Sequence, residues 1–300
     1  MSGRPLDGLG LEKAEGRVDL RGLPAPVPRR LARYEHAGWF IEKLGNLVQF
    51  KDVALRDLDL SGASLDSFRF NGCIIENCVF DGARCNDWRI WETQTRETSF
   101  RKASLREATL GPWSDGKGNT FSRVDFTGAD FRDCTSITAV FEDCDFSRAR
   151  LGKVQFKRCG IVRCTFAGLL AEVEFDGRVF EPDLREPNRY EDVDMSNALL
   201  RLPVFWGIDL PAFRLPADPG LRVIGNYPCV ATEAVKALQG REDLAGRVLR
   251  AILSDERTAD RGYPFGLSSR SDWILLGGED LAELADATLS QAEAACSGTD

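Results

Sequence analysis

Histidine is nearly absent from this sequence, because the 300 residues contain only one, His36. A Ser-His-Asp triad or a multi-histidine metal site would have to be assembled around that single residue. The sequence also lacks GxSxG, P-loop and HExxH motifs and paired cysteine ligands, and no GxGxxG follows an expected strand. We therefore expect no catalytic residues, no metal site and no cofactor.

Long apolar runs are missing as well. No stretch of eighteen apolar residues occurs, and the first residues, MSGRPLDGLGLEKAEGR, are charged and contain no apolar core segment. The sequence thus predicts neither a membrane helix nor a secretory signal, and we expect a cytoplasmic protein. The net charge of −8 disfavours direct nucleic-acid binding, which usually requires a basic patch.

The nine cysteines include no CxxC pair. Their number is odd, and they lie in a long chain without an expected secretory signal, whereas disulfide frameworks are typical of short secreted chains. We expect reduced thiols throughout.

Large apolar residues recur at every fifth position over nearly half of the chain. Two residues before each lies a smaller one, and most positions between are polar. The large positions include Phe50, Leu55, Leu60, Leu65, Phe70, Ile75 and Phe80, and later Phe121, Phe126, Phe131, Phe141, Phe146, Leu151 and Phe156. The small positions include Ala63, Cys73, Cys78, Ala83, Ala129, Cys134, Cys144, Ala149, Cys159 and Cys164. A period of five fits neither an α-helix nor a flat strand.

The segments SGASLDSFRF and AVFEDCDFSRARL carry this pattern most clearly. The pattern resembles the pentapeptide-repeat family, in which four pentapeptides form one square coil of a right-handed quadrilateral parallel β-helix. The resemblance implies a mainly β solenoid over residues 46–183, in which residues twenty apart stack on one face. It places Phe126, Phe146 and Phe166 in one ladder, continued by Leu60, Phe80 and Phe100 in the earlier coils.

The solenoid positions also suggest roles for individual residues. Six of the seven repeat cysteines fall at the small inward position, where a thiol is a compact apolar filler. Cys85 instead falls at a large position, and Trp88 at a small one, where we expect it to push its coil outward. Thr93, Thr95 and Ser136 replace apolar residues, and we expect their hydroxyls to bond to backbone carbonyls.

One break in the period separates Leu110 from Phe121, so six extra residues must leave the coil within a loop insertion at 111–120. Its glycine, proline, aspartate and asparagine residues are typical of turns. We expect Trp91 to face outward one coil earlier. The candidate partner-binding residues here are Trp91, Trp113, Asp115 and Lys117; the alternative is that Trp91 and Trp113 only anchor the loop.

The flanking segments complete a three-part organisation. Residues 1–45 are interpreted as an N-terminal segment with a capping helix at 28–45, which contains His36 as an ordinary packed or surface residue. Residues 184–300 are interpreted as a proline-rich connector and a small helical domain with three helices.

Two functions remain open. The preferred one is a non-catalytic protein–protein interaction scaffold that presents the solenoid surface and the projecting loop to a macromolecular partner. A homodimer is also possible, although flanking segments lie at both ends of the solenoid.

The alternative comes from the resemblance, since some relatives imitate a DNA duplex, bind DNA gyrase or another type II topoisomerase, and confer quinolone-type or self-resistance. Four aspartates on one face are its candidate residues: Asp59, Asp81, Asp125 and Asp145. However, Arg101, Lys102 and Arg148 interrupt this face, and residues 51–180 hold 20 acidic and 19 basic side chains. Such a surface does not approach the charge density of a duplex.

Overall fold

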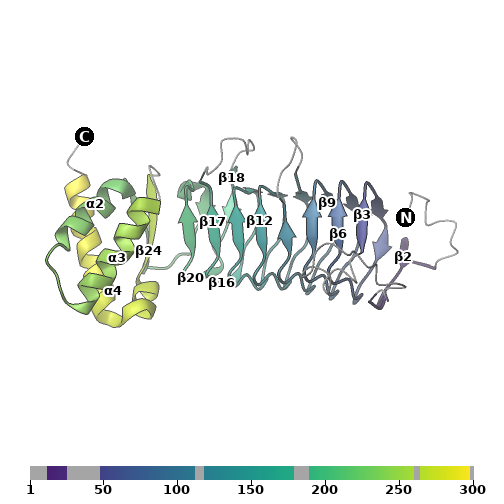
Figure 1. Ribbon diagram of the computed structural model, residues 1–300, viewed down its shortest axis with the longest axis horizontal. Helices are drawn as coiled ribbons and strands as arrows, with labels where there is room; N and C mark the ends of the chain where they lie inside the picture. The colour runs from purple at the N-terminus through teal and green to yellow at the C-terminus, as the bar shows by residue number, and fades with distance from the viewer. Residues whose placement is uncertain (1–11, 26–47, 112–117, 179–188, 260–263, 298–300) are drawn as a thin grey trace, which may run out of the picture.

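A four-sided β-helix forms most of the molecule, and a small helical domain follows it at one end (Figure 1). The structure is a computed structural model that describes residues 12–25, 48–111, 118–178, 189–259 and 264–297. The mainly β solenoid fold and the three C-terminal helices predicted from the sequence are confirmed.

Two faces of the β-helix are parallel sheets made of one short strand per coil. The first face is an eight-stranded sheet of β3 (Gln49–Lys51), β6 (Arg69–Asn71), β8 (Arg89–Trp91), β10 (Thr109–Leu110), β12 (Thr135–Ile137), β14 (Gln155–Lys157), β17 (Glu174–Asp176) and β21 (Val204–Trp206). The second face is a seven-stranded sheet of β4 (Ala54–Arg56), β7 (Ile74–Glu76), β9 (Gln94–Arg96), β11 (Thr120–Ser122), β13 (Val140–Glu142), β15 (Gly160–Val162) and β18 (Tyr190–Glu191).

The other two faces are held mainly by single parallel bridges. On the third face, bridges connect β5 (Leu58–Asp59) through Val79, Ser99, Asp125, Asp145 and Thr165 to β19 (Val193–Asp194), which pairs with β22 (Phe213–Arg214). On the fourth face, bridges connect Ser64, Arg84, Ser104, Asp130 and Arg150, and the strands β16 (Gly168–Ala171) and β20 (Ala198–Arg201) pair further along. Most corners contain a residue with left-handed backbone, such as Asp143 with φ 54°.

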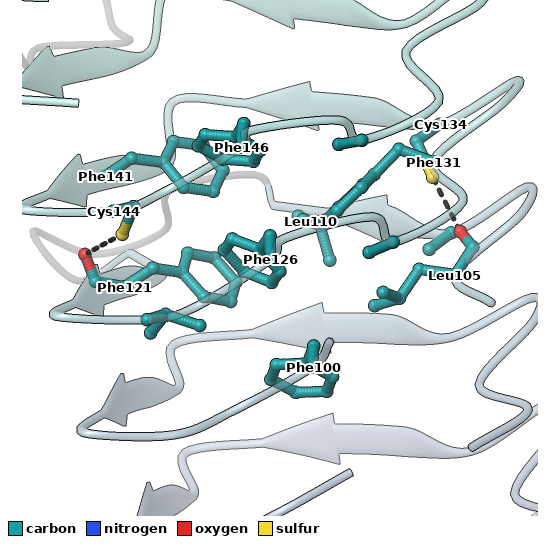
Figure 2. Packing of buried hydrophobic residues seen from close by; sticks show 14 of the residues in the cluster. Phe100, Leu105, Leu110, Phe121, Phe126, Phe131, Cys134, Phe141, Cys144 and Phe146 are labelled. Atoms are coloured by element: carbon teal, nitrogen blue, oxygen red, sulfur yellow. Dashed lines mark hydrogen bonds between the residues drawn. The ribbon is translucent and has the colours of Figure 1, made fainter. Parts of the chain in front are cut away.

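Stacked large side chains fill the interior. The predicted ladder is confirmed, because Phe126 stacks on Phe146 with ring centroids 4.9 Å apart and Phe146 stacks on Phe166 at 4.8 Å. Figure 2 shows Phe100 continuing this ladder beneath Phe126, at 5.4 Å. Aromatic stacks of this kind join each coil to the next through the buried core.

The inserted loop appears as a change in register between coils. Phe121 pairs with Thr95, twenty-six positions earlier, whereas Phe141 pairs with Phe121, twenty positions earlier. Six residues therefore leave the coil before Phe121, as the sequence predicted. Residues 112–117, which include Trp113, Asp115 and Lys117, lie outside the described residues.

The predicted end of the solenoid at residue 183 is too early. Tyr190 pairs with Ile161, Phe205 with Phe175, and Phe213 with Val193, so a further coil and the start of another follow. The five-residue period in fact resumes over the large positions Tyr190, Met195, Leu200, Phe205, Leu210 and Leu215. It was missed because about ten extra residues, with Arg185 at a large position, interrupt the period before Tyr190; Phe205 is thirty positions from its partner Phe175, so the phase itself is kept.

A short hairpin closes the other end. Strands β1 (Lys13–Ala14) and β2 (Arg17–Asp19) are antiparallel, and Val18 of β2 pairs with Leu58 of the first coil. The Arg17 guanidinium also donates to the Asn77 side-chain oxygen at 2.6 Å. The capping helix predicted at 28–45 falls within residues 26–47, outside the described part of the chain.

The C-terminal domain joins the rod through a second hairpin. Strands β23 (Leu221–Gly225) and β24 (Phe265–Ser269) are antiparallel, and Leu221, Phe265 and Leu267 pack against the solenoid core. Ile224 belongs instead to the core of the helices. These helices are α2 (Tyr227–Ala237), α3 (Leu244–Ala259) and α4 (Arg270–Cys296); a 3₁₀ turn, η2 (Leu210–Ala212), precedes β22.

The expectation that all cysteines are reduced thiols is wrong. Cys229 and Cys296 form a disulfide that joins α2 to the end of α4, so the cysteines are not all thiols; their separation of 67 positions gave no indication that the two ends meet. A disulfide is uncommon in cytoplasmic proteins, so this correction also bears on the predicted location. Trp88 is fully buried among Phe70, Phe80 and Phe100, and the adjoining strand β8 keeps its regular register with β6 and β10.

Candidate protein-binding surface

The interior of the β-helix is packed with thiols and aromatic rings, and the thiols form hydrogen bonds to backbone carbonyls. The Cys144 thiol contacts the Phe121 carbonyl at 3.4 Å and the Cys134 thiol contacts the Leu105 carbonyl at 2.7 Å (Figure 2). Burial raises the pKa of Cys134 and of Cys159 to about 12. These thiols therefore stay protonated near neutral pH and are poor nucleophiles or metal ligands, and the surface is the place to look for function.

Two further features bear on the kind of site. Among the described residues, no group of three or more His, Cys, Asp or Glu side chains converges as metal ligands would. Within the same residues, every helix is too short or too polar to cross a bilayer.

Trp91 lies at the end of β8, partly exposed, on the first face. Its carbonyl accepts hydrogen bonds from the Thr93 hydroxyl at 2.8 Å and the Gly72 amide at 3.1 Å. The Thr93 hydroxyl thus bonds to a backbone carbonyl, as predicted, whereas the prediction is wrong for Thr95, whose buried hydroxyl has no hydrogen-bond partner among the described residues. Trp91 remains available to a partner at the base of the inserted loop, although its expected companion Trp113 lies outside the described residues.

The loop is fixed at its base by Asn119, which the sequence analysis did not single out. Its buried side chain donates to the Ile90 carbonyl at 2.7 Å and accepts from the Thr93 amide at 3.1 Å. The last residue before the loop, Gly111, has φ 138° and lies so close to the Ile137 carbonyl that a Cβ would be 2.1 Å from that oxygen. Both ends of the insertion are therefore held against the neighbouring coils by buried contacts.

The side chains of the candidate aspartates stabilise turns at the corners of the coils. Asp59, Asp125 and Asp145 share the third face, and each accepts from the backbone amide two residues later, at 3.0, 2.8 and 2.8 Å. The expectation of one shared face is wrong for Asp81, because Val79 takes the third-face position in its coil; Asp81 lies at the adjoining corner and accepts from the Ser99 hydroxyl and the Arg101 amide. Such local bonds explain these aspartates without a partner.

Arginines also neutralise part of this acidic surface. Arg101 pairs with Asp125 at 3.0 Å, and Arg21 lies 3.9 Å from Asp59. On the second face, Arg96 and Arg56 each bond to Glu76 at 2.7 Å and hold its pKa down to about 2. Opposite charges thus alternate along the rod, which does not resemble the uniform charge of a duplex.

An apolar pair on the fourth face was missed by the sequence analysis. Leu169 of β16 and Leu199 of β20 pair directly and are 47% and 64% exposed. The outward positions of the earlier coils on this face are polar: Ser64, Arg84, Ser104, Asp130 and Arg150. The altered phase of the repeat after Phe166 concealed that these two leucines point outward while Leu170 and Leu200 point inward.

Comparisons with known proteins agree with the repeat pattern. Residues 121–159 match a family described as Pentapeptide repeats, in eight copies. No curated protein matches the chain.

Two kinds of solved structure are similar to the rod. HetL, a pentapeptide repeat protein involved in heterocyst differentiation regulation from the cyanobacterium Nostoc sp. strain PCC 7120, is 14% identical with a TM-score of 0.39, over 71% of this chain and 94% of HetL. Full-length QnrB1, a plasmid-mediated fluoroquinolone resistance protein, is 18% identical with a TM-score of 0.21, over 56% of this chain and 82% of QnrB1. Likenesses this low give no information on the partner of the present chain.

Proposed function

The chain is a pentapeptide-repeat protein, and on this premise we propose that it is a non-catalytic scaffold that binds another protein through the outer surface of its β-helix. The observation that carries the proposal is the exposed pair Leu169 and Leu199 on an otherwise polar face. Exposed apolar residues that lie together on a polar surface are typical of protein-interaction sites.

The packing of the core supports a non-catalytic role. Large rings such as Phe126, Phe146 and Phe166 occupy the axis of the solenoid and are at most 1% exposed. Binding sites for small substrates are usually concave and lined by a few converging polar groups, whereas the sides of this rod are nearly flat sheets. Trp91 and the inserted loop offer a second candidate contact for the partner.

Duplex mimicry, and with it binding to a type II topoisomerase, receives less support. The carboxylates of Asp59, Asp125 and Asp145 are engaged in turns, and two of them lie near arginines. Dimerisation through the ends of the rod also receives little support, because Val18 pairs with the first coil and Leu221 packs against the core at the other end.

Quantitative affinity purification tests the scaffold proposal. The full chain, carrying a small tag, would be expressed in the cells it comes from, and co-purified proteins would be compared with those on a tagged, unrelated rod-shaped protein. We expect one protein to co-purify in near-stoichiometric amount and to rebind the purified chain in isothermal titration calorimetry. Recovery of no such protein, or failure of the purified pair to bind, would contradict the proposal.

A further inference from the structure

Two leucines and three arginines form what we call the leucine face: Leu169, Leu199, Arg148, Arg150 and Arg201. The leucines are paired across β16 and β20, so their side chains lie next to each other on adjacent coils. Hydrogen bonds from the Arg148 amide to the Ala167 carbonyl (2.7 Å) and from the Lys153 amide to the Ala171 carbonyl (3.0 Å) place Arg150 beside Leu169.

The exposed leucines belong to strands whose opposite side packs into the core. Leu170 and Leu200, which alternate with the exposed leucines along the same strands, are 1% and 7% exposed and belong to the core. Strand pairing therefore fixes where Leu169 and Leu199 point, and a partner would bury them without ordering a loop.

The arginines around this centre are poorly neutralised. Arg150 lies 4.0 Å from Asp130, but Asp130 already accepts two shorter bonds from Arg132, at 2.9 and 2.6 Å. Within the described residues, no carboxylate forms an ion pair with Arg148. Arg201 forms no ion pair within this part of the chain either, but it interacts electrostatically with Asp272, which accepts from the Leu202 amide at 2.9 Å. Glu172 is an exposed carboxylate at the nearest corner.

This arrangement differs from the rest of the rod. On the second face, Arg56 pairs with Glu76 at 2.7 Å, and Arg163 pairs with Glu142 and Asp143 at 2.6 and 2.7 Å. The chain as a whole carries a charge of −8, yet the leucine face has an excess of positive charge around an apolar centre. Positive charge that is left without an internal partner is available to an external one.

We propose that the leucine face docks an acidic, amphipathic segment of a partner protein, with apolar side chains against Leu169 and Leu199 and carboxylates toward the three arginines. The proposal rests on the scaffold function and names its contact surface and the chemistry of its partner. Guanidinium groups can accept carboxylates in two parallel hydrogen bonds, which would add orientation to the apolar contact.

Selection from a random-peptide phage library on the immobilised full chain tests this inference. Phage that bind the immobilisation surface alone would be removed, and the best peptide would be synthesised and its affinity measured by fluorescence polarisation. We expect peptides rich in Asp and Glu with leucine or an aromatic residue at helical spacing. Leu199→Asp and Arg201→Glu should each weaken binding by at least about tenfold.

A matched control is Leu244→Asp, because Leu244 is 71% exposed on α3, far along the chain from this face. It should leave peptide affinity unchanged, and circular dichroism would check that all variants fold. Selection of no peptide above background, of basic or neutral peptides, or of peptides insensitive to Leu199→Asp would overturn the inference. If a native partner is recovered but binds the Leu199→Asp variant normally, this surface is wrong while the scaffold function stands.

Discussion

Side chains at the small inward position of several coils donate to equivalent backbone carbonyls. Cys78, Cys144, Cys159 and Cys164 each approach the carbonyl of the large-position residue twenty-three positions earlier, at 3.4 to 3.6 Å. Trp88 uses the equivalent carbonyl, since its indole nitrogen donates to Leu65 at 2.6 Å. These side chains fill space and also satisfy a buried acceptor, although a thiol is a weak donor.

The buried thiols predict a loss of stability at alkaline pH. Burial raises the pKa of Cys78 to about 11 and of Cys134 and Cys159 to about 12, whereas an unfolded thiol titrates near pH 8.5. The unfolded chain alone releases these protons as pH rises past that value, so unfolding becomes more favourable. We expect the free energy of unfolding, measured by urea denaturation, to fall by about 1 kcal/mol per thiol between pH 7.5 and 9.5, and the urea midpoint to fall with it.

Cys134→Ala and Cys159→Ala variants provide the control, because each should reduce the pH dependence while keeping the fold. Equal urea midpoints at the two pH values would contradict this account of the thiols.

Trp88 and Cys85 are predicted to compensate for each other in volume. Trp88→Ala should cost about 3–5 kcal/mol by leaving a cavity, and Cys85→Leu alone should cost about 1–3 kcal/mol by overfilling the core. The double variant should be more stable than the sum of the two changes implies, because leucine then occupies space vacated by the indole. Chemical denaturation of the four proteins measures this coupling, and simple additivity would show that the two sites are independent.

At the scale of structural elements, Asn119 is predicted to hold the inserted loop to the coil. Asn119→Leu removes its bonds to Ile90 and Thr93 within a buried site. We expect a loss of about 2 kcal/mol because the buried Thr93 amide loses its partner, whereas the Ile90 carbonyl keeps its bond from the Gly111 amide. Asn197→Leu is the matched control, since Asn197 is exposed at a corner, and it should change stability by less than about 0.5 kcal/mol. Thermal melts that show equal effects would contradict the role of Asn119.

The elements that the sequence predicts well are those with an unbroken period. The residues from Phe121 to Phe166 keep their five-residue spacing, so the Phe126 ladder and the inward cysteines follow directly. The period also resumes at Tyr190 in the phase of Phe175, but the inserted residues interrupt it, so the coil that ends near Leu215 resembles a connector in the sequence. The leucine face has a different cause: the large positions Phe166 and Leu170 are only four apart, and a one-residue slip of this kind changes which residues point outward.

Contacts between distant elements were beyond the reach of a local pattern. Nothing in the sequence near Val18 indicates that β2 pairs with the first coil. In the same way, the Cys229–Cys296 bond depends on how α2 and α4 pack, since the two cysteines are separated by 67 positions. Composition and spacing alone do not determine such tertiary contacts.

At the scale of the whole molecule, the distribution of charge argues against a duplex mimic. Residues 51–180 are nearly neutral, whereas residues 181–300 hold 21 acidic and 12 basic side chains. In a gyrase supercoiling assay, with and without a quinolone, we expect the full chain to neither inhibit nor protect the enzyme at micromolar concentration. A short DNA duplex serves as the competing control. Inhibition that is weakened by Asp125→Lys and Asp145→Lys would instead support mimicry.

Site-specific photo-crosslinking in the cells of origin tests the scaffold function most directly. A photoreactive residue would replace, one at a time, Leu169, Leu199, Trp91, Leu23 and Leu244, all of which are at least partly exposed. We predict one discrete protein adduct from positions 169 and 199 and none from position 244. An absence of adducts from every position on the rod would contradict the claim that this protein works by binding another.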